Sequence, residues 1–145
     1  MTHTISPVGD SAILISFGDV ICPTINRKIQ RVIETVHDMK DPAIYELIPA
    51  YTSLMIQYDA LTYSYGELKS KLEPVLAITV DISEEDTVTV IEIPTLYGRD
   101  CGPDLSFVAK YHTMSEDDVI SIHSGTDYLV YMLGFIPGFA YLGGM

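Results

Sequence analysis

The chain has 145 residues, and 8 Lys or Arg against 20 Asp or Glu give it a formal net charge of −12. This charge repels phosphate backbones and anionic lipid surfaces, so we expect neither nucleic acid nor a membrane as a partner. No apolar run approaches the roughly 20 residues that span a bilayer, and the first 20 residues lack a signal-peptide pattern, which predicts a cytoplasmic protein.

The first predicted elements are a strand and a helix. An apolar run closed by glycine predicts the strand at residues 11–17. Pro23 is typical of a first helical turn, and the apolar residues after it recur on one helical face, so we expect a helix that ends near Met39. These apolar residues are Ile25, Ile29, Val32, Ile33 and Val36.

Two strands and a second helix follow. Residues 44–49 and 53–58 are apolar runs joined by a short connection, which is typical of adjacent strands. Ser64 and Glu67 have the spacing of a capping box and predict the start of a helix, which Pro74 should kink or stop.

A further strand is predicted at residues 87–93. It follows the acidic residues 81–86, which we interpret as a solvated linker. With this strand the order becomes βαββαβ, the ferredoxin-like split arrangement of an α+β fold. The same strand can equally begin a second domain.

The next predicted elements are two short helices. Residues 104–111 follow a loop rich in glycine and proline and predict the first. Ser115 is a typical N-cap for the second, because acidic residues follow it in the first turn. This second helix should end near residues 123–125.

The final stretch, residues 134–144, holds four glycines and a proline, which argues against a helix or a regular strand. We predict a loop that leaves a buried strand at residues 128–133. Its glycines let a ligand or another chain approach the backbone, while Phe135, Phe139 and Tyr141 can wall a small pocket. A tight barrel corner whose aromatic rings fill the core explains the composition equally well. No nucleotide-binding fingerprint is present.

Few other residues suggest chemistry. His123 lies before the final strand and has the near-neutral pKa range of an acid-base group, although a histidine at a helix end explains its position too. Arg99 can hold a carboxylate or phosphate, or balance nearby aspartates. The two cysteines and four histidines lack ligand spacing, so we predict no metal and no disulfide framework.

Three stretches together resemble one family, the B subunit of prokaryotic 5-oxoprolinase, also labelled KipI-like or allophanate hydrolase subunit 1. They are Pro49-Ala50-Tyr51-Thr52-Ser53-Leu54 with Tyr58-Asp59, Ile93-Pro94 with Tyr97-Gly98 and Gly102-Pro103-Asp104-Leu105, and Tyr131 to Gly144. The resemblance implies a small α/β domain at residues 1–86, followed at residues 87–145 by the first part of a cyclophilin-like β-barrel. Family members continue into further strands, so we expect the barrel to be incomplete here.

The resemblance also implies a function. Members act in a cytoplasmic complex in which the B, C and A subunits open 5-oxoproline to glutamate with ATP, which makes this chain a non-autonomous subunit of an amide (lactam) hydrolase. We expect ATP to be used by the complex, with no ATP-binding motif and no other cofactor in this chain. His123 or Tyr128 is then the expected proton-transfer residue. The expected substrate-binding residues are Arg99, Gly134, Phe135, Pro137, Gly138, Phe139, Tyr141, Gly143 and Gly144.

Two rival interpretations stay open. A KipI-like protein inhibits a sensor histidine kinase by binding it and needs no catalytic residue, so such a kinase is the alternative partner. A likeness to the carboxyl-transfer portion of urea amidolyase would predict dependence on biotin. Self-association into a homo-oligomer is compatible with each of these.

Overall fold

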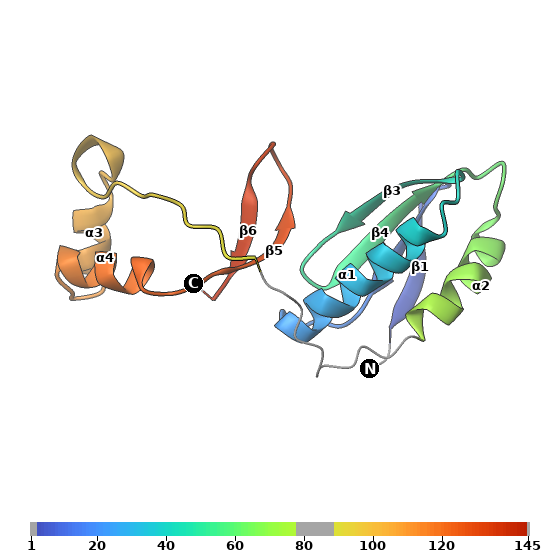
Figure 1. Ribbon diagram of the computed structural model, residues 1–145, viewed down its shortest axis with the longest axis horizontal. Coiled ribbons are helices and arrows are strands. Elements are labelled where there is room, and N and C mark those ends of the chain that lie inside the picture. The colour runs from blue at the N-terminus through green and yellow to red at the C-terminus, as the bar shows by residue number, and fades with distance from the viewer. Residues whose placement is uncertain (1–2, 78–88, 145) are drawn as a thin grey trace. The chain divides into compact units, whose positions relative to one another are not determined.

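The computed structural model describes residues 3–77 and 89–144. By their contacts, residues 1–84 together with 129–145 form one compact unit, and residues 85–128 form a second. The first unit holds a four-stranded sheet, two helices and a C-terminal hairpin, and the second holds short helices (Figure 1). Helices with antiparallel sheets confirm the predicted α+β class.

Six elements build the N-terminal part of the first unit. In chain order they are β1 (Thr4–Val8), β2 (Ala12–Ser16), α1 (Pro23–Asp38), β3 (Ile44–Pro49), β4 (Ser53–Tyr58) and α2 (Tyr65–Leu76). The strands form one antiparallel sheet in the order β1-β2-β4-β3. Because β2 and β3 both run antiparallel to β4, they are parallel to each other, and α1 connects them across the strand between.

The predicted strand and helix order is confirmed up to α2, but the place of the remaining strand was wrong. β1, which the sequence analysis missed, pairs with β2 and occupies the outer edge of the sheet. Residues 89–93 of the predicted strand 87–93 have no strand structure, and residues 87 and 88 lie outside the described residues. Ile91 and Ile93 are exposed there. Without a neighbouring strand, such a segment gains no ladder hydrogen bonds. The order is therefore ββαββα instead of βαββαβ.

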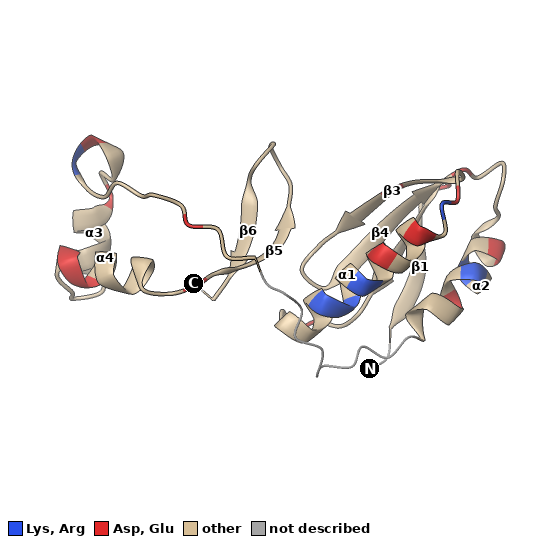
Figure 2. Ribbon diagram, viewed as in Figure 1, with Lys and Arg blue, Asp and Glu red and all other residues tan. Residues whose placement is uncertain are grey.

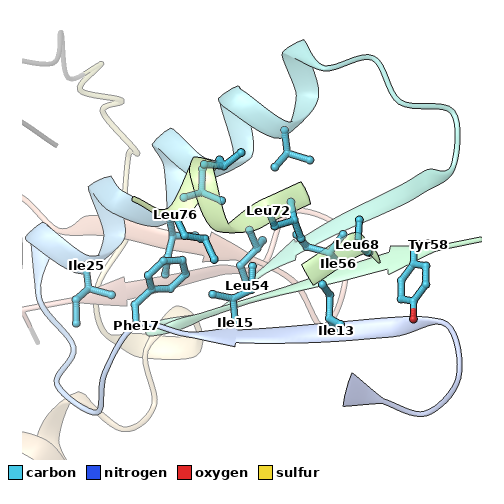
Figure 3. Close-up of a cluster of buried hydrophobic side chains, with 14 residues drawn as sticks. Ile13, Ile15, Phe17, Ile25, Leu54, Ile56, Tyr58, Leu68, Leu72 and Leu76 are labelled. Carbon is cyan, nitrogen blue, oxygen red and sulfur yellow. The ribbon is translucent and has the colours of Figure 1, made fainter. Parts of the chain in front are cut away.

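The core lies between one face of the sheet and both helices. Strand residues alternate in direction, so Ile13, Ile15, Leu54 and Ile56 are fully buried while their neighbours in sequence are less buried. Figure 3 shows these side chains packed with those of α1 and α2. Burial of a branched side chain of this size contributes about 1.5 to 3 kcal/mol, so this layer supplies most of the unit's stability.

Both helices begin as the sequence predicts. Pro23 occupies the first turn of α1, and a capping box joins Ser64 to Glu67 at the start of α2. Pro74 does not stop α2, which continues to Leu76. Leu72 and Leu76 are buried on either side of the proline, so the packing of this last turn offsets the lost hydrogen bond.

A polar network ties α2 to the turn before β3. The Tyr63 hydroxyl donates to Asp41 Oδ2 at 2.8 Å, and Lys71 Nζ donates to the same carboxylate oxygen and to the Tyr63 oxygen. The Lys71 hydrogen bond is the main cause that lowers the pKa of Asp41, and the Tyr63 hydrogen bond adds to it. The network therefore stabilises the ionised carboxylate.

The second unit contains a 3-10 turn, η1 (Arg99–Cys101), and two helices, α3 (Leu105–Tyr111) and α4 (Glu116–Ser124). The predicted cap of α4 is confirmed, because Ser115 and Asp118 form a capping box. Ala109 is the only buried hydrophobic residue among residues 89–128. This unit therefore has almost no core of its own.

The C-terminal residues form a hairpin of β5 (Leu129–Leu133) and β6 (Ala140–Gly143). The prediction that residues 134–144 contain no regular strand was wrong for residues 140–143, and the loop is limited to residues 134–139. No charged residue occurs in residues 128–145, and the hairpin is uncoloured in the charge view (Figure 2). The cyclophilin-like barrel remains a prediction.

Candidate functional site

The hairpin is held at its base by two hydrogen bonds from the N-terminal elements. Asn26 on α1 donates from Nδ2 to the carbonyl oxygen of Tyr131 in β5, at 3.0 Å. The hydroxyl of Tyr51, in the turn between β3 and β4, donates to the carbonyl oxygen of Leu142 in β6, at 3.1 Å. Each strand of the hairpin is therefore attached to a different element.

Aromatic rings continue from this base along the hairpin. The Tyr51 ring centroid lies 5.4 Å from that of Tyr131 and 6.1 Å from that of Tyr141. The Phe139 centroid lies 5.2 Å from Tyr141 and 6.1 Å from Phe135. Tyr131 is 5% exposed, Phe139 45% and Phe135 87%, so the row leads from a buried end to an exposed tip. The rings at the tip do not fill the core.

The glycines of the hairpin have different physical roles. A Cβ on Gly143 would lie 2.2 Å from a ring carbon of Tyr131, so this glycine makes room for that ring. Gly138 and Gly144 have φ of +79° and +91°, a backbone region that favours glycine. A Cβ on Gly134 would be in ordinary contact with Tyr141.

The loop at the tip is closed by its own backbone. The Gly134 amide donates to the carbonyl of Phe139 at 3.1 Å, and the Phe139 amide donates to that of Ile136 at 3.0 Å. Phe135 has a positive φ of 65° although it is not glycine. Such a conformation costs about 1 to 3 kcal/mol and persists where the surrounding structure imposes it. Pro137 stands in the same turn.

A second group of candidate residues lies in the other unit. The Tyr97 hydroxyl and His123 Nδ1 are 2.6 Å apart, and the Tyr128 hydroxyl donates to the His123 carbonyl at 3.1 Å. The rings of Tyr97 and Tyr128 lie 5.7 and 5.6 Å from the His123 ring. The structure therefore brings together both predicted proton-transfer residues. It adds Tyr97, whose only sequence signal was its place in the Tyr97-Gly98 motif.

Arg99 lies in η1 with φ of +51° and is exposed. Its side chain forms no ion pair with Asp100 or Asp104, all three residues being described by the structure. An exposed guanidinium of this kind is available to an anion. Its role as a substrate-binding residue remains a prediction.

Metal and membrane sites were searched within residues 3–77 and 89–144. In that part of the chain, no three His, Cys, Asp or Glu side chains are grouped so that they could hold a metal ion. Cys22 and Cys101 are both free thiols. None of the helices there has both the length and the apolar content needed to cross a bilayer.

Comparisons with known proteins cover nearly the whole chain. Residues 3–145 match the family model of the carboxyltransferase domain, subdomain C and D. The chain is 37% identical to the 5-oxoprolinase B subunit of Bacillus subtilis (strain 168), with 99% of this chain and 63% of the relative covered. It is 30% identical to the protein of that name from Escherichia coli O157:H7, over 95% of this chain and 62% of the relative. The chain thus spans less than two thirds of the length of these relatives.

Solved structures agree with this assignment. The structure of TTHA0988 is 30% identical, has a TM-score of 0.72, and aligns over 90% of this chain and 24% of its own. The urea carboxylase of Kluyveromyces lactis is 18% identical with a TM-score of 0.63, over 91% of this chain and 14% of its own, which shows a shared fold. The chain therefore belongs to the carboxyltransferase subdomain C and D family and, within it, to the group of 5-oxoprolinase B subunits that its motifs predicted.

Proposed function

We propose that this chain acts within the B subunit of a 5-oxoprolinase complex, which opens 5-oxoproline to glutamate with the use of ATP and with subunits C and A as partners. The observation that carries the proposal is the identity of 37% over 99% of the chain with a protein named as a 5-oxoprolinase B subunit. A cytoplasmic location is part of the same proposal.

The chemistry calls for several parts. A lactam carbonyl is stabilised by resonance, so its direct hydrolysis is slow. Transfer of a phosphoryl group to the carbonyl oxygen converts that oxygen into part of a leaving group. Attack by water at the same carbon then releases phosphate and breaks the C–N bond. Negative charge develops on oxygen during these steps, and oriented donors are the usual means of stabilising it. The chain has neither nucleotide-binding fingerprint, so ATP would bind on another subunit.

In this proposal the hairpin supplies one wall of the substrate site. Its uncharged sequence and the exposed rings of Phe135 and Phe139 provide an apolar surface that can exclude water. Gly138 lets the backbone come close to the substrate, because a Cβ there has no neighbour within 4 Å and the space beside it is open. The hairpin therefore shapes the site chiefly through its backbone and aromatic rings.

His123 is the proposed proton-transfer residue, with Tyr97 and Tyr128 holding it in place. A hydroxyl 2.6 Å from Nδ1 selects the orientation of the ring, and the second hydroxyl fixes the carbonyl of the same residue. Acid-base catalysis by such a group contributes about 10² to 10⁴ in rate.

The chain alone should be inactive. The second unit exposes Leu96, Phe107 and Tyr111, and the hairpin exposes Leu133 and Phe135. Large exposed apolar side chains of this number are typical of surfaces that are covered in an assembly. We therefore expect that glutamate is formed only when this chain is part of the complete B subunit and subunits A and C are present.

The test is ATP-dependent glutamate release by the assembled complex. We expect His123→Gln and Gly138→Val each to lower the turnover at least tenfold while the complex still assembles, with Gln30→Ala on the exposed face of α1 as the control. Undiminished turnover in both variants would exclude these residues from the site. A complex without activity that instead blocks autophosphorylation of a sensor histidine kinase would favour the alternative function.

A further inference from the structure

The buried polar residue Asn26 stands out within α1. At 6% exposure it is the one buried polar residue among the described residues, and it lies on the helix face that also buries Ile25 and Ile29. Burying an amide without a partner costs about 1 to 3 kcal/mol. Its partner is the backbone carbonyl of Tyr131, 105 positions later in the chain. The amide therefore has a directional role that an apolar residue at this position could not provide.

Tyr51 makes the second attachment, on the other strand of the hairpin. Its hydroxyl bonds the Leu142 carbonyl while its ring contacts those of Tyr131 and Tyr141. Tyr131 in turn packs against Gly143, where any Cβ would collide with it. One residue thus fixes β6 by a hydrogen bond and both strands by ring contacts.

Two attachments on different strands restrict the hairpin more than one would. A two-stranded hairpin by itself is at best marginally stable in water. A single hydrogen bond leaves rotation about that bond, whereas donors on α1 and on the β3–β4 turn fix both strands. The tip, residues 134–139, then takes its position from the N-terminal elements.

We infer that Asn26 and Tyr51 are positioning residues of the glycine hairpin, so that the N-terminal α/β part of the chain serves to hold the tip in its working position. This inference rests on the proposed function for its catalytic consequence. The attachment itself rests on the contacts alone. Neither side chain touches the reacting atoms in this proposal.

Hydrogen exchange tests the attachment without reference to any reaction. Asn26→Asp and Tyr51→Phe should each speed exchange of the β5 and β6 amides about fivefold relative to the wild-type protein, with little change in β2 and β4. Matched controls are Gln30→Ala, which removes an exposed amide from α1, and Tyr63→Phe, which removes a hydroxyl bonded elsewhere in the same unit. Neither control should alter exchange in the hairpin. Equal exchange in wild type and both variants would overturn the inference.

Asn26→Asp adds a pH-dependent readout. An ionised carboxylate placed against the Tyr131 carbonyl repels it, whereas a protonated carboxyl has an O–H that can donate as the amide does. The excess exchange, taken as a ratio to wild type at each pH, should therefore disappear as the pH falls and the carboxyl is protonated. An excess that is independent of pH would point to general loosening and would overturn the directional role of this hydrogen bond.

Kinetics in the assembled complex test the consequence. With a positioned tip, Asn26→Asp and Tyr51→Phe should lower kcat/KM for 5-oxoproline at least fivefold, and Asn26→Asp should recover at low pH in parallel with its exchange. Faster hairpin exchange with unchanged kcat/KM would refute the positioning role. A wild-type complex that releases no glutamate would refute the proposed function instead, and would leave the exchange result standing.

Discussion

Gly143→Ala is the substitution whose effect follows most directly from the geometry of the hairpin. The new Cβ would lie 2.2, 3.0 and 3.2 Å from three ring atoms of Tyr131. These distances are shorter than real contacts, so the ring must move. Tyr131 is buried and lies against the Tyr51 ring, which leaves it no free direction. The alanine therefore acts on the attachment of the hairpin as well as on β6.

The magnitude combines three effects. Overpacking a filled site costs about 1 to 3 kcal/mol. Separation of the Tyr51 and Tyr131 rings costs about 0.5 to 1.5 kcal/mol. Replacement of glycine by alanine restricts the unfolded chain and returns about 0.4 to 1 kcal/mol. The expected net result is a loss of about 1 to 3 kcal/mol in the free energy that holds the hairpin in place.

The assay is native-state hydrogen exchange of the β5 and β6 amides, together with urea unfolding of the whole chain. Gly66→Ala is the matched control, since Gly66 lies in α2 without a positive φ, and no atom lies within 4 Å of the position that its Cβ would take. Alanine should stabilise that helix by about 0.5 to 1 kcal/mol. A Gly143→Ala protein as stable as wild type, with unchanged hairpin exchange, would refute the proposed packing of Tyr131.

Three other outcomes can be measured. Asp41→Asn should lower the free energy of unfolding by about 1 to 2 kcal/mol at pH 7, a value reduced for solvent screening because Lys71 is partly exposed. The lowered pKa of Asp41 means that this stabilisation is present above the unfolded carboxyl pKa of about 3.9 and is lost as the pH falls through the folded value, so urea midpoints of the two proteins should converge in acid. Ser64→Ala should cost about 1 kcal/mol in the same unfolding assay, because its capping box starts a helix with buried Leu68 and Leu72, whereas Ser115→Ala should leave that transition unchanged. Tyr97→Phe should lower glutamate release by the complex at least fivefold, with Tyr111→Phe as the control, and equal rates would remove Tyr97 from the site.

The elements that sequence predicted well are those whose pattern is local. β4 alternates buried and less buried residues along its length, and α1 repeats apolar residues on one face, so either can be recognised without knowledge of its neighbours. The cap at Ser64 is likewise a local signal. These features account for the sheet and helices of the first unit.

The elements that were missed depend on contacts between distant residues. β1 contains Pro7 and little apolar surface, and it becomes a strand because β2 offers it an edge. β6 ends in a glycine that weakens a strand in isolation, but the Tyr131 ring covers Gly143. Residues 89–93 show the opposite case, because a strand-like composition there finds no partner within the described residues.

The candidate site was predictable in part. The glycine-rich motif and His123 could be named from sequence, whereas Tyr97 could not be tied to His123, because 26 positions separate them. Asn26 did leave a signal, since an amide stood on an otherwise apolar helix face. Its importance becomes clear only with the Tyr131 carbonyl in view, a backbone group that every sequence contains.

Both side chains that anchor the hairpin bind main-chain oxygens, those of Tyr131 and Leu142, instead of side chains. An attachment of this kind is insensitive to the identity of the residues at the turn between them. Evolution or an engineer could exchange residues 134–139 as a cassette, and so alter what the tip recognises, without rebuilding the mount on which it stands.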